Sequence, residues 1–192
     1  MNIKNKIPET CIFSSFIINE FLDDPFSVKK IKGYSKKRVR NLLRIKDYKK
    51  LKKFFNLLRP KMYEITFTRI KEWREAEITK KELGELKVIN VPEWRNFFYN
   101  NRRGNMGQLV NKIRNKKIIF NKRIKKILKI SRNAEELKKM LSGEKRIIIL
   151  KNSKGFYSVL EGDHRVPALL LSGIKFKILP VYLGIKKPKE KF

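Results

Sequence analysis

The chain has 192 residues, of which 49 are lysine or arginine and 18 are aspartate or glutamate, so that its net charge is +31. Hydrophobic residues make up 41% of the sequence, which suits a folded protein with a core rather than a disordered chain. The sequence contains no run of about 18 uninterrupted apolar residues, so we expect no membrane span. A single cysteine excludes an internal disulfide, and we therefore expect a cytoplasmic protein.

The excess of positive charge predicts a polyanionic partner. In a protein with a net charge of this size, the positive side chains repel one another in the folded state and attract polyanions. Nucleic acid, most simply DNA, is the partner that we expect, because each phosphate neutralised by a lysine or arginine releases a counterion. The alternative explanation is that the protein comes from an AT-rich or heat-adapted organism, whose proteins are generally rich in lysine and isoleucine. Heat-adapted proteins, however, usually enrich glutamate along with lysine, and here the acids have not kept pace.

Residues 1–60 are predicted to form a basic helical extension. Aromatic and aliphatic residues from Phe13 to Phe21 approximate helical spacing, and this first helix should end before Pro25. Between Lys29 and Lys53 there are thirteen basic residues and one acid, on a second amphipathic helix that Ser35 could cap and Pro60 should end. This helix either binds nucleic acid or an anionic surface, or presents a solvated basic face. The candidate nucleic-acid contacts are Lys36, Lys37, Arg38 and Arg40.

Residues 61–185 are predicted to form an α+β domain with a small mixed sheet, followed by a basic tail over 186–192. Alternating residues predict a strand over 62–70, and a dense cluster of glutamates among lysines and arginines predicts a salt-bridged helix over 71–85. Residues 86–91 are a further strand candidate.

A second basic block lies between Glu93 and Glu135, where no acid occurs. The block is either a polyanion-binding arm or one face of a folded site, and its apolar residues favour folding. We expect nucleic-acid contacts at Arg114, Lys116, Lys117 and Arg123. The aromatic residues of 94–99 could stack on bases or belong to the core.

After this block, a helix is predicted over 134–141 and a β-hairpin over 146–160. The stretch that follows the hairpin predicts a turn, a short helix and a returning strand over 178–183. Gly162 permits a sharp turn, Asp163 is an N-cap candidate, and Pro167 is tolerated only near a helix start. His164 and Arg165 would then lie in the first helical turn, where free N–H groups and the helix dipole attract phosphate.

The segment Glu161-Gly-Asp-His-Arg165, followed by Ala168 and Gly173, resembles the core motif of the ParB/sulfiredoxin superfamily. The resemblance covers roughly residues 135–184. It implies a ParB/sulfiredoxin-like fold in which the loop and helix start bind the phosphates of a nucleotide. The superfamily includes DNA-partition proteins that bind CTP, sulfiredoxins, free-serine kinases and nuclease-like proteins. An Asn101-Arg102-Arg103 box is similar to one that lies near the phosphate site in this superfamily.

The chain departs from the superfamily pattern at two positions. Asp163 stands where sulfiredoxins carry a catalytic cysteine, and the only cysteine is Cys11, which argues against sulfinic-acid repair. His164 stands where partition proteins carry the first of two adjacent arginines. These departures are compatible with phosphate binding at this motif, but they argue against a CTP-driven switch.

The candidate site residues follow from these observations. Phosphate or nucleotide binding is expected at Gly162, Asp163, His164, Arg165, Arg102 and Arg103. Glu161, Asp163 and His164 are the candidate catalytic residues, and Glu161 with Asp163 could hold Mg²⁺ beside a nucleoside triphosphate. Asp163 could equally be only the N-cap. Whether the chain is catalytic and whether it pairs as a homodimer are left open.

Two functions are compatible with the sequence. One is a nucleic-acid-associated protein, either partition-like or a nuclease, that binds a nucleotide or a DNA phosphate at Gly162–Arg165. The other is a small-molecule phosphotransferase resembling the free-serine kinases. The charge of +31 favours the first, because a metabolite kinase has no need of two basic blocks.

Overall fold

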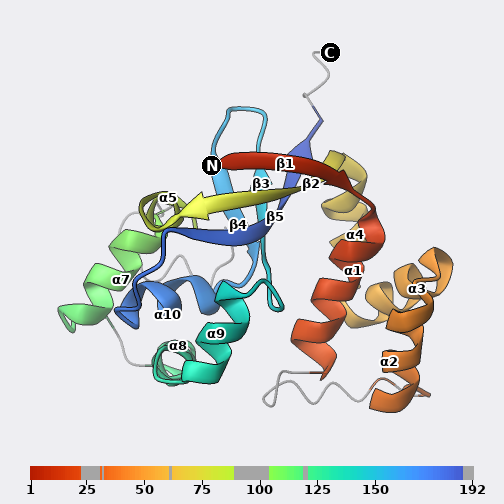
Figure 1. Cartoon of the computed structure of the whole chain (residues 1–192), viewed down its shortest axis with the longest axis horizontal. Helices are drawn as coiled ribbons and strands as arrows, with labels where there is room; N and C mark the ends of the chain where they lie inside the picture. Colours follow the sequence, from red (N-terminus) through yellow and green to blue (C-terminus); the bar gives the residue numbers. More distant parts are fainter. Residues whose placement is uncertain (23–30, 32, 61, 89–103, 119–120, 188–192) are drawn as a thin grey trace.

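A five-stranded mixed sheet lies at the centre of the molecule, with strand order β1-β2-β5-β3-β4 (Figure 1). The computed structural model describes residues 1–22, 31, 33–60, 62–88, 104–118 and 121–187. The strands are β1 (Asn2–Ile7), β2 (Ile70–Thr79), β3 (Ile147–Lys151), β4 (Tyr157–Glu161) and β5 (Ile178–Lys186). Strands β3 and β5 run parallel, and the other neighbours are antiparallel. The predicted α+β class with a mixed sheet is confirmed.

Local sequence signals specify the β3–β4 hairpin. Its first strand is a β-branched and aliphatic run, and its turn contains Asn152, whose Oδ1 accepts from the backbone N–H groups of Lys154 and Phe156 at 2.9 and 3.0 Å. Gly155 adopts a φ of +81°, which a residue without a Cβ adopts at little cost. The predicted hairpin is therefore confirmed.

The segment predicted as a salt-bridged helix over 71–85 is instead the strand β2 followed by the short helix α5 (Lys80–Glu85). Two glutamates of this strand pair with cations on other elements: Glu77 with Lys4 of β1, and Glu75 with Arg146 at 2.5 Å. Glu72 pairs with Arg74 of the same strand at 2.8 Å. The strand predicted over 62–70 is also wrong. It forms the short helix α4 (Met62–Ile65) and a 3-10 turn (Phe67–Arg69), because Phe67 turns into an aromatic core.

The N-terminal segment is not purely helical, because β1 pairs with β2 at the edge of the sheet. Helix α1 (Glu9–Ile17) follows and continues as one π-helical turn (Ile18–Leu22). The single basic helix that we expected is two helices, α2 (Lys36–Ile45) and α3 (Tyr48–Leu58). The break occurs where Lys46 adopts a φ of +55° and Asp47 caps α3 through the N–H of Lys50 at 3.0 Å. Ser35 caps α2, as predicted.

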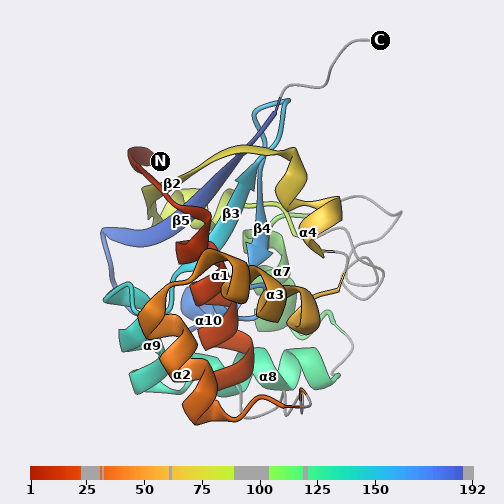
Figure 2. The same cartoon turned by 90° about the vertical axis from the view of Figure 1, so that its right-hand side faces the viewer.

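Helices cover the two faces of the sheet with different side chains. Helices α1, α2 and α3 lie on one side (Figure 2), where they form a largely aromatic core that includes Phe13, Phe16, Phe54, Phe55, Phe67 and Trp73. The other side carries α5, α7 (Met106–Arg114), α8 (Lys122–Ser131), α9 (Ala134–Leu141) and α10 (Arg165–Leu171), with a largely aliphatic core. Alternate residues of β3 enter the two cores, as the pleat requires.

Candidate functional site

The motif that the sequence singles out forms the link between β4 and α10. Gly162 adopts a φ of +99°, and a Cβ there would lie 3.1 Å from Cγ1 of Ile147, so the turn requires glycine. The helix begins at Arg165, and Pro167 lies in its first turn, as predicted. Gly173 follows the helix with a φ of +77°, which confirms the predicted stop.

The prediction that Asp163 caps α10 is wrong. The N-cap position is His164, whose side chain makes no capping bond, and α10 is only seven residues long. The carboxylate of Asp163 lies 2.9 Å from Nδ1 of His164 and 3.7 Å from Nη1 of Arg123. Asp163 therefore connects the motif to the start of α8 rather than capping the helix.

Arg165 is buried, with only 8% of its surface exposed. Its Nη2 donates to the carboxylate of Glu161, and its Nη1 donates to Oδ1 of Asn19 at 3.3 Å and to the carbonyl of Lys145 at 3.2 Å. The structure thus occupies both terminal nitrogens of the guanidinium with internal acceptors. An external phosphate could take the place of Glu161 on Nη2 only after this ion pair opens.

Two residues of this site come from the π-helical turn after α1. Asn19 accepts from Arg165 and donates through Nδ2 to Oε2 of Glu161 at 3.1 Å. Glu20 is 8% exposed and accepts twice from Nε of Arg59, at 2.7 and 2.8 Å. Turns of π-helix are rare in proteins, and those that occur are often found at functional sites. We refer to Asn19, Glu20, Arg59, Glu161, Asp163 and Arg165 as the Glu161 cluster.

The sequence reasoning did not find Asn19, Glu20 or Arg59. A signal was present for the first two, because they are polar residues at the end of an otherwise apolar run from Ile12 to Phe21. No sequence pattern links that run to the motif more than 140 residues later. Packing of α1 against the sheet brings them together.

Electrostatic interactions connect the members of the Glu161 cluster. Burial raises the pKa of the Glu161 carboxyl to about 7, although the charge of Arg165 opposes the shift; the charges of Glu20 and Asp163 add to it. Burial lowers the pKa of Arg59, but the hydrogen bond and charge of Glu20 outweigh burial, and Glu161 and Asp163 also contribute, so the pKa is raised. Glu161 is thus a largely buried carboxyl, with a side chain that is 13% exposed, and it titrates near neutral pH, which is a property of acid–base catalysts.

The contacts of Glu161 and Asp163 do not fit a resident Mg²⁺. Arg165 and Asn19 occupy the first carboxylate, and Arg123 and His164 accompany the second. Within the described residues, no group of three or more histidine, cysteine, aspartate or glutamate side chains could hold a metal ion. We therefore assign no step to magnesium at this position.

The predicted nucleic-acid contacts on α2 are all exposed. Two of them are also held in place: Lys36 donates to the carbonyl of Leu22 at 3.0 Å, and Arg38 donates to the carbonyl of Gly33 at 2.8 Å while its guanidinium lies 5.0 Å from the centre of the Tyr34 ring. Lys37 and Arg40 share the same exposed helix.

The predicted contacts of the second basic block lie at and after the end of α7 and at the start of α8. Arg114, Lys116 and Lys117 are exposed, and Arg114 donates to the carbonyl of Leu170 at 3.0 Å. Arg123 is half-buried against Asp163. Arg102 and Arg103, the Asn101 box and the aromatic residues of 94–99 lie outside the described residues.

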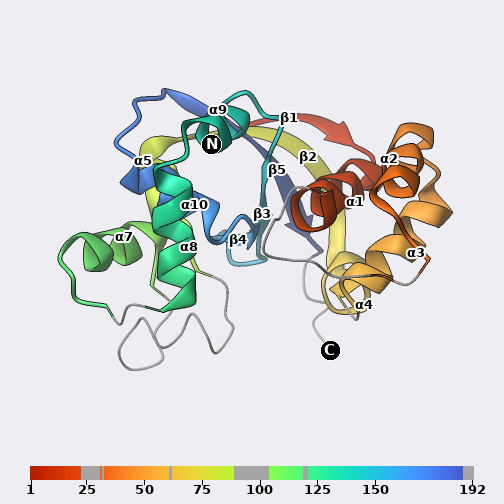
Figure 3. The same ribbon diagram turned by 90° about the horizontal axis from the view of Figure 1, so that it is seen from below.

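The structure brings the two basic blocks to the same end of the molecule. Figure 3 looks at this end and shows α8 on one side and α2 with α3 on the other, with α1 viewed along its axis between them. The link between β4 and α10, which carries the Glu161 cluster, lies between α8 and α1. The cluster is therefore flanked by basic helices that are far apart in the sequence.

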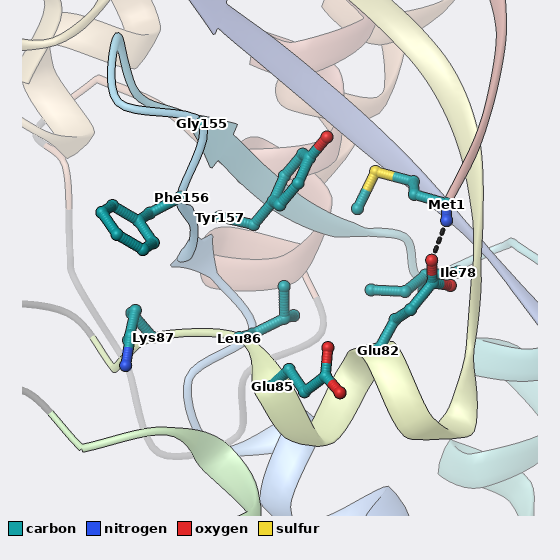
Figure 4. A pocket seen from close by; sticks show the side chains of 9 residues that line it. All are labelled: Met1, Ile78, Glu82, Glu85, Leu86, Lys87, Gly155, Phe156 and Tyr157. Atoms are coloured by element: carbon teal, nitrogen blue, oxygen red, sulfur yellow. Dashed lines mark hydrogen bonds and ion pairs between the residues drawn. The ribbon is translucent and has the colours of Figure 1, made fainter.

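A pocket of about 250 Å³ lies beside α5 and the β3–β4 turn (Figure 4). Phe156 and Tyr157 form one side, and Glu82, which accepts from the amino group of Met1, lies on the other with Glu85. This pocket is at the opposite end of the sheet from α2 and α8 (Figure 1). Its carboxylates make it a poor site for a phosphate.

No helix in the described part of the chain is both long enough and apolar enough to span a bilayer. Comparison of the chain with protein-family models, with curated proteins and with solved structures finds no match. The geometry of the Glu161 cluster and of the basic helices around it is therefore the basis for assigning a function.

Proposed function

We propose that the protein binds nucleic acid, most simply DNA, with α2 and the α7–α8 region contacting phosphates on either side of the Glu161 cluster. One observation carries the proposal: these helices contain no acidic residue, and α2 and α8 lie at the same end of the fold, on either side of α1, although they are far apart in the sequence. A basic helix that is merely solvated has no reason to lie at the same end of the fold as a second one. Phosphate contacts of this kind would provide sequence-independent affinity.

The likeness of Glu161–Arg165 to the ParB/sulfiredoxin motif supports a phosphate-binding role for the Glu161 cluster, beside the helices that would contact nucleic acid. A nucleotide or a nucleic-acid phosphate would bind at Gly162–Arg165 when the Glu161–Arg165 pair opens. Protonation of Glu161 would weaken that pair, and its pKa of about 7 makes this accessible near neutrality. The protein would then be a partition-like relative in which a bound phosphate replaces an internal carboxylate.

A nuclease is a second candidate, because Glu161 is a buried carboxyl with a pKa suited to accept a proton from water. The flanking basic helices would hold the strand while Glu161 acts as the general base. A metabolite phosphotransferase would not use these helices.

The salt dependence of DNA binding tests the main proposal. Fluorescence anisotropy of a labelled duplex would give the binding constant at several salt concentrations for the wild type and for a Lys37→Gln/Arg40→Gln/Arg44→Gln variant. The slope of log K against log salt is negative, and its magnitude should decrease by about three for the variant, because about one fewer counterion is released for each phosphate contact that is lost.

The matched control removes the same charge elsewhere. Lys71, Lys175 and Lys177 are exposed and lie outside the basic helices, so that Lys71→Gln/Lys175→Gln/Lys177→Gln should leave the slope close to that of the wild type. An equal loss in both variants would show that only net charge matters and would contradict a specific face. Nicking of supercoiled plasmid by the wild type but not by Glu161→Gln would establish the nuclease reading, and intact plasmid would reject it.

A further inference from the structure

A second pocket, of about 180 Å³, lies between α1 and the turn that precedes β3. Thr10, Cys11 and Ser14 line it from α1, and Lys46 lines it from the end of α2. Arg146 and Tyr182 line it from the sheet. None of these residues belongs to the Glu161 cluster.

The pocket contains hydrogen-bond donors that the described part of the chain does not use. Within that part, the hydroxyl groups of Thr10 and Ser14 have no hydrogen-bond partner, and the ammonium group of Lys46 has no ion pair. Arg146 gives Nη1 to Glu75 at 2.5 Å, which leaves its Nε and Nη2 without a partner among the same residues. Three different elements thus present donors to one small cavity.

The arrangement of Arg146 fixes the position of its unused donors. Its guanidinium lies 4.8 Å from the centre of the Tyr182 ring, and Glu75 holds one end. The only carboxylate that lines the pocket among the described residues, Glu144, accepts a hydrogen bond from the Ser142 hydroxyl at 3.0 Å. A positioned arginine, a lysine and two hydroxyl donors suit a compact oxyanion with several acceptor oxygens.

We propose that this pocket binds the phosphate group of a phosphomonoester. Arg146 and Lys46 would contact the charge, and the hydroxyl groups of Thr10 and Ser14 would donate to the phosphate oxygens. The cavity is smaller than the roughly 300 to 1,000 Å³ of sites that enclose drug-sized ligands, so the rest of the ligand would extend into solvent. This inference goes beyond the proposed function and does not depend on it, because it involves a different site.

Cys11 makes the proposal directly testable. It is the single cysteine of the chain and it lines the pocket, so that alkylation of the protein by iodoacetamide reports on this position alone. The alkylation rate would be measured with inorganic phosphate and, at the same ionic strength, with chloride. When phosphate is present at about nine times its Kd, the rate should fall about tenfold, because only the unoccupied protein reacts.

Two variants assign the protection to the pocket. Lys46→Asn removes the lysine while keeping a residue that tolerates the positive φ, and it should abolish most of the protection. Ser14→Ala removes one hydroxyl without changing the charge or the helix, and it should weaken protection severalfold. Lys175→Gln, which removes the same charge from an exposed position outside both the pocket and the basic helices, should leave protection unchanged.

The source of the phosphate group is resolved by comparing ligands. Protection by inorganic phosphate and by adenosine monophosphate would indicate a free phosphomonoester. Protection by a 5′-phosphorylated oligonucleotide alone, and not by its unphosphorylated counterpart, would indicate the end of a nucleic acid. If none of these ligands protects Cys11, or if protection is lost equally in Lys175→Gln, the proposal is wrong. The salt slope of duplex binding is measured separately, so either proposal can fail without the other.

Discussion

Arginines occur in two contrasting regions of this protein, the Glu161 cluster and the exposed face of α2. In the cluster, Arg165 is 8% exposed and donates to a carboxylate, an amide and a backbone carbonyl. On α2, Arg40 and Arg44 are exposed and have no ion-pair partner among the described residues. The same side chain is therefore a structural element in one region and an available contact in the other.

The difference shows that burial, rather than residue type, decides what a charge does here. A buried ion pair is costly to break, because removing one partner leaves an uncompensated charge out of water. An exposed charge contributes little to stability, yet it remains free to neutralise a phosphate. The two regions should consequently respond in opposite ways to the same substitution.

The largest effect is expected for Arg165→Met, which leaves Glu161 buried without its cation. The free energy of unfolding should fall by about 3 to 5 kcal/mol. Urea denaturation followed by circular dichroism would measure it. Arg40→Met, the same chemical change on the exposed face, is the matched control and should cost less than about 0.5 kcal/mol. Similar losses in the two variants would remove the distinction between the regions.

A smaller effect is expected from pH, and it arises from the cluster alone. The pKa of Glu161 is about 7 in the folded protein and about 4.5 for an ordinary glutamate, so the folded state binds this proton more tightly. Its contribution to stability is therefore complete below about pH 4.5 and is lost as the pH rises through 7. Between about pH 5 and about pH 8 the wild type should lose about 2 to 3 kcal/mol relative to Glu161→Gln.

The comparison with Glu161→Gln is needed because other groups titrate in the same range. Urea denaturation at a series of pH values would give the difference between the two proteins. A difference that stays constant with pH would mean that Glu161 remains ionised in the folded protein, paired with Arg165.

On the exposed side, α2 depends on its cap more than on its charges. Ser35 accepts from the N–H of Arg38 at 3.2 Å, and Ser35→Ala should cost about 1 kcal/mol because that N–H loses its partner. Thermal unfolding would detect the loss, and Ser35→Asp should restore most of the stability. If Ser35→Ala unfolds like the wild type, α2 contributes little to the cooperative unit.

The smallest effect on stability is expected for the Lys37→Gln/Arg40→Gln/Arg44→Gln variant, although it should weaken DNA binding. Its free energy of unfolding should stay within about 1 kcal/mol of the wild type, and it could increase because self-repulsion decreases. Urea denaturation at low and high salt would separate these contributions. A large loss of stability would mean that the α2 charges have structural partners after all.

Local signals determined much of the fold. The aliphatic run at 147–150, the Asn152 turn, the glycine at 162 and the helix over 134–141 each depend on neighbouring residues, and the structure confirms all four. The charge pattern over 71–85 wrongly predicted a helix, because opposite charges three or four residues apart are typical of ion pairs on a helix surface. In the structure, Glu77 pairs with Lys4 and Glu75 pairs with Arg146, and each of these partners lies more than 70 residues away in the sequence.

The candidate site divides in the same way. The sequence by itself determined that Glu161–Arg165 forms a turn and a helix start, because glycine and proline restrict the backbone locally. Only the tertiary structure decided that Arg165 is buried rather than exposed, because the packing of α1 against the sheet places Asn19 against its guanidinium, and Glu20 against Arg59 beside it. Burial and charge pairing depend on residues from distant segments, and no local pattern in the sequence records which segments will meet.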